Sequence, residues 1–512
     1  MVYGTLSYLG KQLRNGSVSS VDLIKHSLNA LEKTKHLNAF ITVDNNQSLL
    51  DQAQLSDKQQ QQSTSTSRRP LEGIPIAVKD NFSTTGLKTT CASNILANYT
   101  PSFDATVVSL LKQAGAIIIG KTNMDEFAMG SSTTNGHSGA SINPWSTTTT
   151  APLVAGGSSG GSAVAVSSRV VPCAIGSDTG GSVRQPAAYC GVVGFKPSYG
   201  SISRYGLVAY ASSFDTPGFF VHSADDAALL LDVLVRRDPR DSTSIKHPTE
   251  GGFAKHLEKT RTSGFAGLRF GIPTDYLVSE MDPEIIALWR QTAELIESNG
   301  GQVVPVELPN TRHALPAYYI LATSEASSNL SRYDGIRYGG GSGNNSEQHE
   351  TAQTLKQQYI DTRSAGFGPE ATRRILLGTM SLSRGSYDNY YTKAQQIRRL
   401  VSDDFKRAFE EQHVDVLITP TTPSGSFALN QDLDPINMYI NDIMTIPANM
   451  AGLPSASIPL KLSSKGTPLS LQLIGNHQCD HQVLEAVAKV MEMSAFQGFS
   501  KHTPHLIKEL GL

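Results

Sequence analysis

Gly156-Gly157-Ser158-Ser159-Gly160-Gly161-Ser162 runs directly into the apolar residues Ala163-Val164-Ala165-Val166. Flexible linkers share the glycine- and serine-rich composition, but they are not usually followed at once by apolar helix formers. The two glycines before Ser158 permit backbone conformations that bulkier residues do not adopt. The segment therefore predicts a glycine-rich turn that leads into a buried helix, an arrangement that often builds anion and oxyanion sites.

A second segment of similar composition, Gly176-Ser177-Asp178-Thr179-Gly180-Gly181-Ser182, follows, and Gly73-Ile74-Pro75-Ile76-Ala77-Val78-Lys79-Asp80 precedes both. Together they supply two serines and an amine, and no histidine base is obvious. A serine hydroxyl needs a base to take its proton, and a neutral lysine can replace histidine. Because Lys79 ends a strand-like apolar run, we expect it to be partly buried, with a lowered pKa that suits a base near neutral pH. The three segments indicate amide hydrolysis by a Ser-Ser-Lys relay.

Two other kinds of site compete for the first segment. A phosphate-binding loop is disfavoured because no Gly-Lys-Ser/Thr follows the glycines. A nucleophile elbow requires Gly-x-Ser-x-Gly, and Gly157 to Gly161 matches that string around Ser159. The match is weak in so glycine-rich a segment, and no supporting histidine stands out.

The lysine segment, both Gly/Ser segments and Gly191-Val192-Val193-Gly194-Phe195-Lys196-Pro197-Ser198 resemble, in this order, the pattern of the amidase signature family. The resemblance implies that Ser182 is the acyl nucleophile and Lys79 the base. It also implies that Ser158 is a bridging serine after a cis peptide bond at Gly157. We expect backbone amides near the nucleophile to form the oxyanion hole, namely those of Thr179, Gly180 and Gly181.

Further segments resemble one subgroup, the A subunits of glutamyl-tRNA(Gln) amidotransferases: 80–84, 120–130, 196–200, 324–330 and 333–338. This similarity runs from about Leu6 to about Gly498. It implies hydrolysis of glutamine and transfer of the ammonia to a partner that uses ATP to convert Glu-tRNA(Gln) into Gln-tRNA(Gln). The implied assembly is a heterotrimer with subunits B and C, in which tRNA is bound mainly through the partner. ATP and Mg²⁺ belong to the partner, and no cofactor or metal is expected in this chain.

Glutamine carries an α-carboxylate and an α-ammonium, so a selective pocket needs one cation and one anion away from the reacting amide. Arg374 and Asp442, both in matching segments, are the candidates for these roles. Arg373 competes for the carboxylate because only the register separates it from Arg374. Glu126 and a tyrosine, Tyr318 or Tyr319, are candidates for the ammonia path, although a satisfied buried glutamate and core aromatics explain them equally well.

Composition sets the broad class of the protein. The 512 residues are 39% hydrophobic, which is enough for a large core, and the net charge of −2 gives no support for direct tight binding of nucleic acid. Four scattered cysteines form no CxxC or metal-binding pattern, and the thirteen histidines show no HExxH. We expect a reducing compartment and a chain without a membrane span.

Helix and strand patterns alternate along the chain, which predicts an α/β fold of the amidase signature type, with a central mixed β-sheet flanked by helices on both faces. Expected helices cover 105–115 and 284–298, and expected strands cover 116–119, 303–308 and 414–418. We predict a single domain over 1–512: an N-terminal helical segment (1–55), a disordered insertion (59–69) and a catalytic core (70–500). Residues 145–152 and 339–347 also have the composition of inserted loops.

The N-terminus gives a mixed signal about location. Residues 1–20 carry Lys11 and Arg14 without an acidic residue, a weak trait of transit peptides, yet the leucines there read as folded helices. The insertions and the subgroup resemblance favour an organellar form, so we predict the mitochondrial matrix, or the cytoplasm if the source is bacterial. A free-standing amidase acting on small or fatty amides is the alternative function. A non-catalytic scaffold is disfavoured because it would need none of the three catalytic residues.

Overall fold

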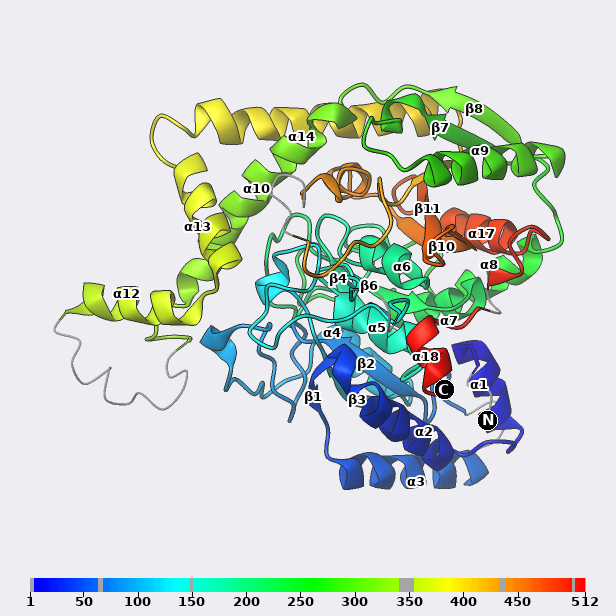
Figure 1. The fold of residues 1–512 in the computed structure, drawn as a ribbon, viewed down its shortest axis with the longest axis horizontal. Coiled ribbons are helices and arrows are strands. Elements are labelled where there is room, and N and C mark those ends of the chain that lie inside the picture. Colours follow the sequence, from blue (N-terminus) through cyan, green and yellow to red (C-terminus); the bar gives the residue numbers. More distant parts are fainter. Residues whose placement is uncertain are drawn as a thin grey trace.

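One mixed sheet organises the chain in the computed structural model, which describes residues 4–62, 68–147, 151–339, 354–431, 439–499 and 502–511. Its eleven strands lie in the order β1-β3-β2-β4-β6-β5-β10-β11-β9-β7-β8 (Figure 1). β2 is parallel to β3 and β4, β7 is parallel to β8 and β9, and the other neighbours are antiparallel. The strands are β1 Phe40–Val43, β2 Pro75–Lys79, β3 Ile117–Thr122, β4 Cys173–Asp178, β5 Val193–Lys196, β6 Thr216–Val221, β7 Arg269–Pro273, β8 Gln302–Val306, β9 Val416–Pro420, β10 Ser455–Leu462 and β11 Pro468–Gly475.

Helices cover both faces of this sheet, and the alternation of side chains along the strands explains why. In β3, Ile118 packs into one hydrophobic cluster while Ile117 and Ile119 pack into another. The predicted α/β fold is therefore confirmed. The helices are α1 Leu6–Arg14, α2 Ser20–Lys33, α3 Asn46–Gln62, α4 Thr106–Gln113, α5 Gly160–Ser167, α6 Arg184–Cys190, α7 Ala224–Leu234, α8 Phe253–Thr260, α9 Pro283–Ser298, α10 Ala314–Asn329, α12 Leu355–Gly366, α13 Pro369–Ser381, α14 Lys393–Lys406, α16 Ile446–Met450, α17 Asp480–Met491 and α18 His505–Glu509.

Local sequence signals locate several elements correctly. α4 and α9 occupy the two predicted helices, and β3, β8 and β9 overlap the three predicted strands. At the N-terminus, Ser19 accepts from the Asp22 amide and Asp22 from the Ser19 amide, a capping box that begins α2. Leu6 and Leu9 of α1 are buried. The N-terminal segment thus belongs to the folded body, because its apolar side chains complete the core.

One boundary of the predicted insertion is wrong. Gln59 to Gln62 form the end of α3 and are not a disordered loop, because glutamine is a good helix former and α3 is anchored through buried Leu49 and Ala53. Residues 63–67 of that segment lie outside the described residues, as do 148–150 and 340–347 of the other two predicted loops. The single-domain division stays a prediction.

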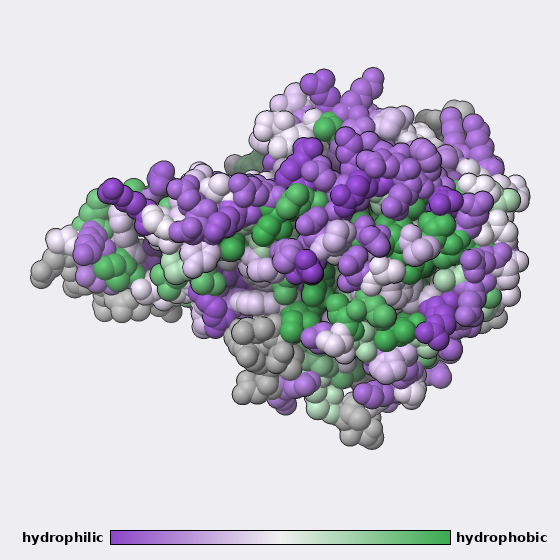
Figure 2. Space-filling model, turned by 90° about the horizontal axis from the view of Figure 1, so that it is seen from above, coloured by the Kyte–Doolittle hydropathy of each residue, from purple (hydrophilic) through white to green (hydrophobic). Residues whose placement is uncertain are grey.

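The helices α12 and α13 extend from the body on the side of α10 (Figure 1). Seen from above, this extension projects to the left and shows apolar side chains among polar ones (Figure 2). Exposed apolar side chains on it are Leu355, Ile360, Leu376, Leu377 and Met380. Among the described helices, none combines the length and the apolar character that a bilayer crossing requires.

Candidate active site

Neighbouring parallel strands bring the three predicted catalytic residues together. β2 ends at Lys79, and β4, which is hydrogen-bonded to it in parallel, ends at Asp178 just before the turn that holds Ser182. Ser158 lies two residues before α5, whose residues pack against β2 and β4. Since parallel strands end at the same edge of a sheet, Lys79, Ser158 and the turn that holds Ser182 all lie at the carboxyl edge, where α/β proteins commonly bind ligands.

The amine of Lys79 contacts the bridging serine directly. Lys79 Nζ donates to Ser158 Oγ at 2.7 Å and to Ser177 Oγ at 2.9 Å. Lys79 and Ser158 are fully buried, whereas Ser182 is 8% exposed. Ser182 is thus the most accessible of the three, as its predicted role of nucleophile requires, and Lys79, the predicted base, is shielded from water. The peptide bond between Gly157 and Ser158 is cis, as the resemblance implies.

Burial sets the proton affinity of this lysine. The loss of hydration disfavours the ammonium and lowers the pKa of Lys79 to about 7, although the carboxylates of Asp125, Asp178 and Asp215 act in the opposite direction. Lys79 is wholly buried rather than partly buried as the sequence suggested. A substantial fraction of the amine is therefore neutral near pH 7, which a general base requires.

The backbone at Gly157 leaves no room for a side chain. A Cβ on Gly157 would lie 2.6 Å from the amide nitrogen of Ser132 and would collide with Asp125. The Gly157 amide donates to Gln185 Oε1 at 2.9 Å, and the Asp125 amide donates to the Ser158 carbonyl at 3.2 Å. These contacts fix the backbone on both sides of Ser158. They explain why the sequence needs a glycine immediately before the bridging serine.

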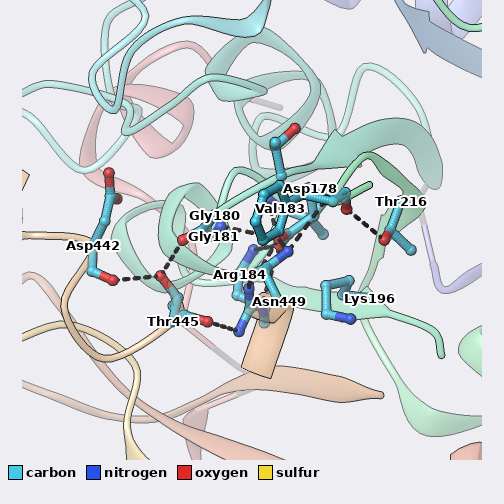
Figure 3. A network of polar contacts seen from close by, with 12 residues as sticks. Asp178, Gly180, Gly181, Val183, Arg184, Lys196, Thr216, Asp442, Thr445 and Asn449 are labelled. Carbon is cyan, nitrogen blue, oxygen red and sulfur yellow. Dashed lines mark hydrogen bonds and ion pairs between the residues drawn. The ribbon is translucent and has the colours of Figure 1, made fainter. Parts of the chain in front are cut away.

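A buried ion pair shapes the turn that carries the nucleophile (Figure 3). Asp178 accepts from the amides of Gly181 at 2.9 Å and Val183 at 3.1 Å, and its carboxylate is also held by Arg184 and Asn449. Burial by itself would raise the pKa of Asp178, but the Arg184 guanidinium beside it holds that pKa well below its usual range. Asp178 is therefore a fixed anion around which residues 179–184 fold.

The oxyanion donors predicted from the sequence are not equivalent. The Gly181 amide is already engaged by Asp178, and the Thr179 hydroxyl donates to Asp215 at 2.7 Å. Within the described residues, the backbone amides of Thr179, Gly180 and Ser182 donate to no protein group. The free donors thus lie on both sides of Gly181, and the oxyanion role of Thr179 and Gly180 stays a prediction.

Arg374 on α13 lies inside a cage of aromatic rings. Its guanidinium carbon lies 5.2 Å from the ring centre of Tyr319 and 5.7 Å from those of Tyr210 and Tyr439. Arg374 Nε donates to Glu370 Oε1 at 2.8 Å, and Nη1 donates to the Tyr210 hydroxyl at 2.8 Å. Nη2 donates to no group in the described part of the chain.

Asp442 contacts the hydroxyl of Tyr319, the tyrosine whose ring lies beside Arg374. The Tyr319 hydroxyl donates to Asp442 Oδ2 at 3.4 Å, and no ion pair joins Asp442 to Arg374 among the described residues. Burial raises the pKa of Asp442 to about 8, although Arg374 acts in the opposite direction. The Asp442 carbonyl accepts from the Thr445 hydroxyl, which also donates to the Gly180 carbonyl at 2.6 Å (Figure 3). Thr445 thus ties this segment to the nucleophile turn.

Comparison with known proteins agrees with this geometry. The amidase family matches residues 22–484. The chain belongs to the amidase family. The mitochondrial A subunit of the glutamyl-tRNA(Gln) amidotransferase of Dictyostelium discoideum is 51% identical, covering 98% of this chain and 99% of the relative, and the A subunit of the Zymomonas mobilis amidotransferase is 44% identical over 94% and 95%. The crystal structure of the Thermotoga maritima A subunit has 36% identity and a TM-score of 0.74, covering 96% of this chain and 95% of the other.

The two neighbouring arginines on α13 of this amidase, Arg373 and Arg374, differ in their exposure. Arg374 is 4% exposed, whereas the side chain of Arg373 is 46% exposed and is paired with Glu370. On a helix, neighbouring residues point about 100° apart, so only one of the two can face the interior. The structure buries Arg374 among tyrosine rings and leaves Arg373 at the surface, so Arg374 is the better candidate for the carboxylate.

The candidates for an ammonia path lie beside the site of this amidase. Glu126 is buried and accepts from the Ser93 hydroxyl and, at 2.8 Å, from the Gly368 amide just before α13. Burial raises the pKa of Glu126. Tyr318 lies against Gly180, where an added Cβ would be 2.7 Å from its hydroxyl. Glu126 is hydrogen-bonded as a structural glutamate would be, so its role in ammonia passage stays a prediction.

Sequence reasoning about this amidase did not single out Asp178, Arg184 or Asn449. Asp178 and Arg184 flank the nucleophile in Ser177-Asp178-Thr179-Gly180-Gly181-Ser182-Val183-Arg184, and opposite charges around a glycine turn were a usable signal. Asn449 carries no such signal because it is distant in the chain. Among the described residues, no cluster of three or more His, Cys, Asp or Glu side chains is placed to hold a metal ion.

A cavity of about 760 Å³ opens elsewhere in this amidase. Its wall includes Asn94, Phe103, Leu207, Tyr333 and Arg337, and none of Lys79, Ser158 and Ser182 lines it. Although this cavity is large, the candidate catalytic residues do not line it, so its volume is no reason to place the amide hydrolysis there.

Proposed function

We propose that this chain is the glutaminase subunit of a tRNA-dependent amidotransferase. The observation that carries the proposal is the pair formed by the Arg374 guanidinium and the Asp442 carboxyl, two buried groups that both contact Tyr319 and are not bonded to each other. Such a pair matches a zwitterion, with the α-carboxylate of glutamine on Arg374 and its α-ammonium on Asp442. A free-standing amidase for neutral amides has no need of it.

The chemistry follows from the proton relay. Lys79 takes the proton of Ser158 as Ser158 takes that of Ser182, and Ser182 Oγ bonds to the side-chain amide carbon of glutamine. The resulting oxyanion is stabilised by backbone amides near the nucleophile. The proton then returns along the relay to the departing nitrogen, the C–N bond breaks, and ammonia leaves. Water attacks the glutamyl ester by the same relay, which releases glutamate and restores Ser182.

The relatives are named as subunits of glutamyl-tRNA(Gln) amidotransferase, so we propose that this chain acts in a heterotrimer with subunits B and C. The ammonia passes by way of Glu126 to a partner, which uses ATP and Mg²⁺ to amidate Glu-tRNA(Gln) and holds most of the tRNA. This chain needs no cofactor of its own. We place the complex in the mitochondrial matrix, which the mitochondrial relative supports, or in the cytoplasm if the source is bacterial.

Ammonia release from glutamine tests this function. It is measured for the chain alone, with subunits B and C, and with Glu-tRNA(Gln) and ATP added. Turnover that increases in the complete complex, together with amidated tRNA, supports the proposal. Failure on glutamine, with hydrolysis of simple or fatty amides by the isolated chain, moves the protein to the free-standing amidases.

A further inference from the structure

Three oxygen atoms surround the nitrogen of the catalytic lysine. Lys79 Nζ lies 2.7 Å from Ser158 Oγ, 2.9 Å from Ser177 Oγ and 3.4 Å from the Ser177 carbonyl oxygen. Two of the three oxygens thus belong to Ser177, a residue that the relay itself does not use. Ser177 is 2% exposed and sits in β4, next to β2, so its backbone position is fixed by the sheet.

The number of hydrogens on a neutral amine limits how many of these three contacts Lys79 can make as a donor. A neutral lysine has two N–H groups and one lone pair, whereas the ammonium has three N–H groups and no lone pair. The Ser177 carbonyl can only accept a hydrogen bond. If Ser177 Oγ also accepts, both N–H groups are directed to Ser177, and the lone pair points at the hydroxyl of Ser158. A lone pair aimed at that proton is the geometry that a general base requires.

Asn81 makes a second contact with Ser177 Oγ. Asn81 Nδ2 donates to Ser177 Oγ at 2.9 Å, and Asn81 is 2% exposed. A hydroxyl oxygen has two lone pairs, and the two donors Lys79 and Asn81 fill both. The hydroxyl hydrogen of Ser177 is then turned away from the amine. Without Asn81, that hydroxyl loses one of the two contacts that hold its orientation, and it turns more easily to donate to the lone pair of Lys79, in competition with Ser158.

We propose that Ser177 and Asn81 are positioning residues that direct the lone pair of Lys79 at Ser158, a role that rests on the proposed Ser-Ser-Lys amide hydrolysis. Ser177 acts on the amine directly, and Asn81 acts through Ser177. Neither touches the reacting amide. Loss of either therefore lowers kcat and leaves the KM for the amide substrate unchanged.

A matched pair of variants isolates the hydroxyl of Ser177. Ser177→Thr and Ser177→Val have the same shape and differ only in that hydroxyl, so any effect of packing is common to both. We expect Val to have a kcat at least ~10-fold below that of Thr, a part of the roughly 10²–10⁴-fold that a general base contributes. We expect their KM values to agree within about 3-fold. Equal kcat values for Thr and Val would overturn the proposal.

A double-mutant cycle tests the order of action. Asn81→Ala is measured in the wild type and in the Ser177→Val background, in the complex with the partner subunits. If Asn81 acts through Ser177, its kcat effect of roughly 3–30-fold disappears in the Val background, whereas a merely structural role gives independent effects that multiply. Ser83→Ala, a buried serine two residues from Asn81, is the control and keeps wild-type kinetics.

These experiments distinguish a failure of the positioning role of Ser177 and Asn81 from a failure of the proposed glutaminase function. If the wild-type complex does not hydrolyse glutamine, the glutaminase proposal fails, and the same variants are compared on whichever simple amide the wild type hydrolyses. A Thr/Val difference on that amide still supports the positioning role. Multiplying effects of Asn81 and Ser177 on any hydrolysed amide overturn the role assigned to Asn81.

Discussion

The guanidinium of Arg184 holds both carboxylate oxygens of Asp178, with Nη2 at 2.9 Å from Oδ1 and Nε at 3.0 Å from Oδ2. Both side chains are completely buried. Arg184 also donates to the Thr445 carbonyl at 2.9 Å and to Gln472 Oε1 at 2.6 Å. The turn that carries Ser182 is thereby fastened to the segment that carries Asp442 and to β11.

Asp178→Asn should destabilise the protein strongly. The variant keeps the shape of the side chain but leaves the buried Arg184 charge without its partner, which typically costs about 3–5 kcal/mol. Urea unfolding of the complex measures the change in the free energy of unfolding. Asp403→Asn is the control, because its partner Arg399 has a side chain that is 76% exposed, and such surface pairs contribute only about 0–1 kcal/mol. Equal losses for the two variants would contradict the structural role of Asp178.

Ser182→Ala should abolish ammonia release from glutamine while leaving the fold intact. Among the described residues, Ser182 Oγ makes no hydrogen bond, and it is the least buried of the three catalytic groups, so its removal costs little stability. Turnover should decrease by more than roughly 10³-fold, because the acyl nucleophile is lost. The melting temperature is measured alongside. Retained turnover would take the nucleophile role away from Ser182.

Lys79→Ala should lower kcat by at least the roughly 10²–10⁴-fold typical of a general base. In the wild type, kcat should increase as the pH is raised through about 7 and then level off, because burial lowers the pKa of Lys79 to about 7 and only the neutral amine takes a proton. A profile of kcat against pH from 5 to 9 measures this limb. A kcat that decreases over that range with increasing pH would show that a protonated group is the active form.

Asp442 adds a second titration that appears only in kcat/KM. Burial raises the pKa of Asp442 to about 8, and only its charged form attracts the α-ammonium of glutamine. Affinity for glutamine should therefore increase with pH through about 8. The value of kcat/KM should depend on deprotonation of both Lys79 and Asp442, whereas kcat should depend on Lys79 alone. Asp442→Asn should remove the upper limb and raise KM. An unchanged kcat/KM profile in that variant would separate Asp442 from substrate binding.

Arg374→Lys should raise the KM for glutamine by roughly 10–100-fold, because a lysine keeps the charge but loses the planar fork that holds a carboxylate. Arg373→Lys on the same helix is the matched control and should leave KM within about 2-fold, since the arginine there is at the surface. Steady-state kinetics on glutamine decide between the two. A larger effect at Arg373 would reverse the register that the structure assigns.

The sequence predicted the fold class and supplied Lys79, Ser158 and Ser182 as candidate catalytic residues because both depend on local signals. Ser158, Ser182 and Lys79 lie in short segments, the two Gly/Ser segments and the lysine segment, that can be recognised in the sequence. The alternation of helix and strand patterns indicated an α/β sheet. The sequence patterns of 105–115 and 284–298 located α4 and α9. The end of α3 was missed because a glutamine-rich tract has the composition of a disordered loop and the propensity of a helix.

The tertiary structure alone decided which groups meet. Strand order is set by pairing between segments that are distant in the chain. The contact of Asn449 with Asp178 likewise joins residues that are 271 positions apart. The choice of Arg374 over Arg373 depends on how α13 is rotated against its neighbours. The roles of Ser177 and Asn81 depend on β2 lying beside β4. The sequence by itself thus determined which chemical groups are available, because these are properties of single residues and short segments. Only folding determined their distances, burial and proton affinities, because these depend on neighbours that are remote in the chain.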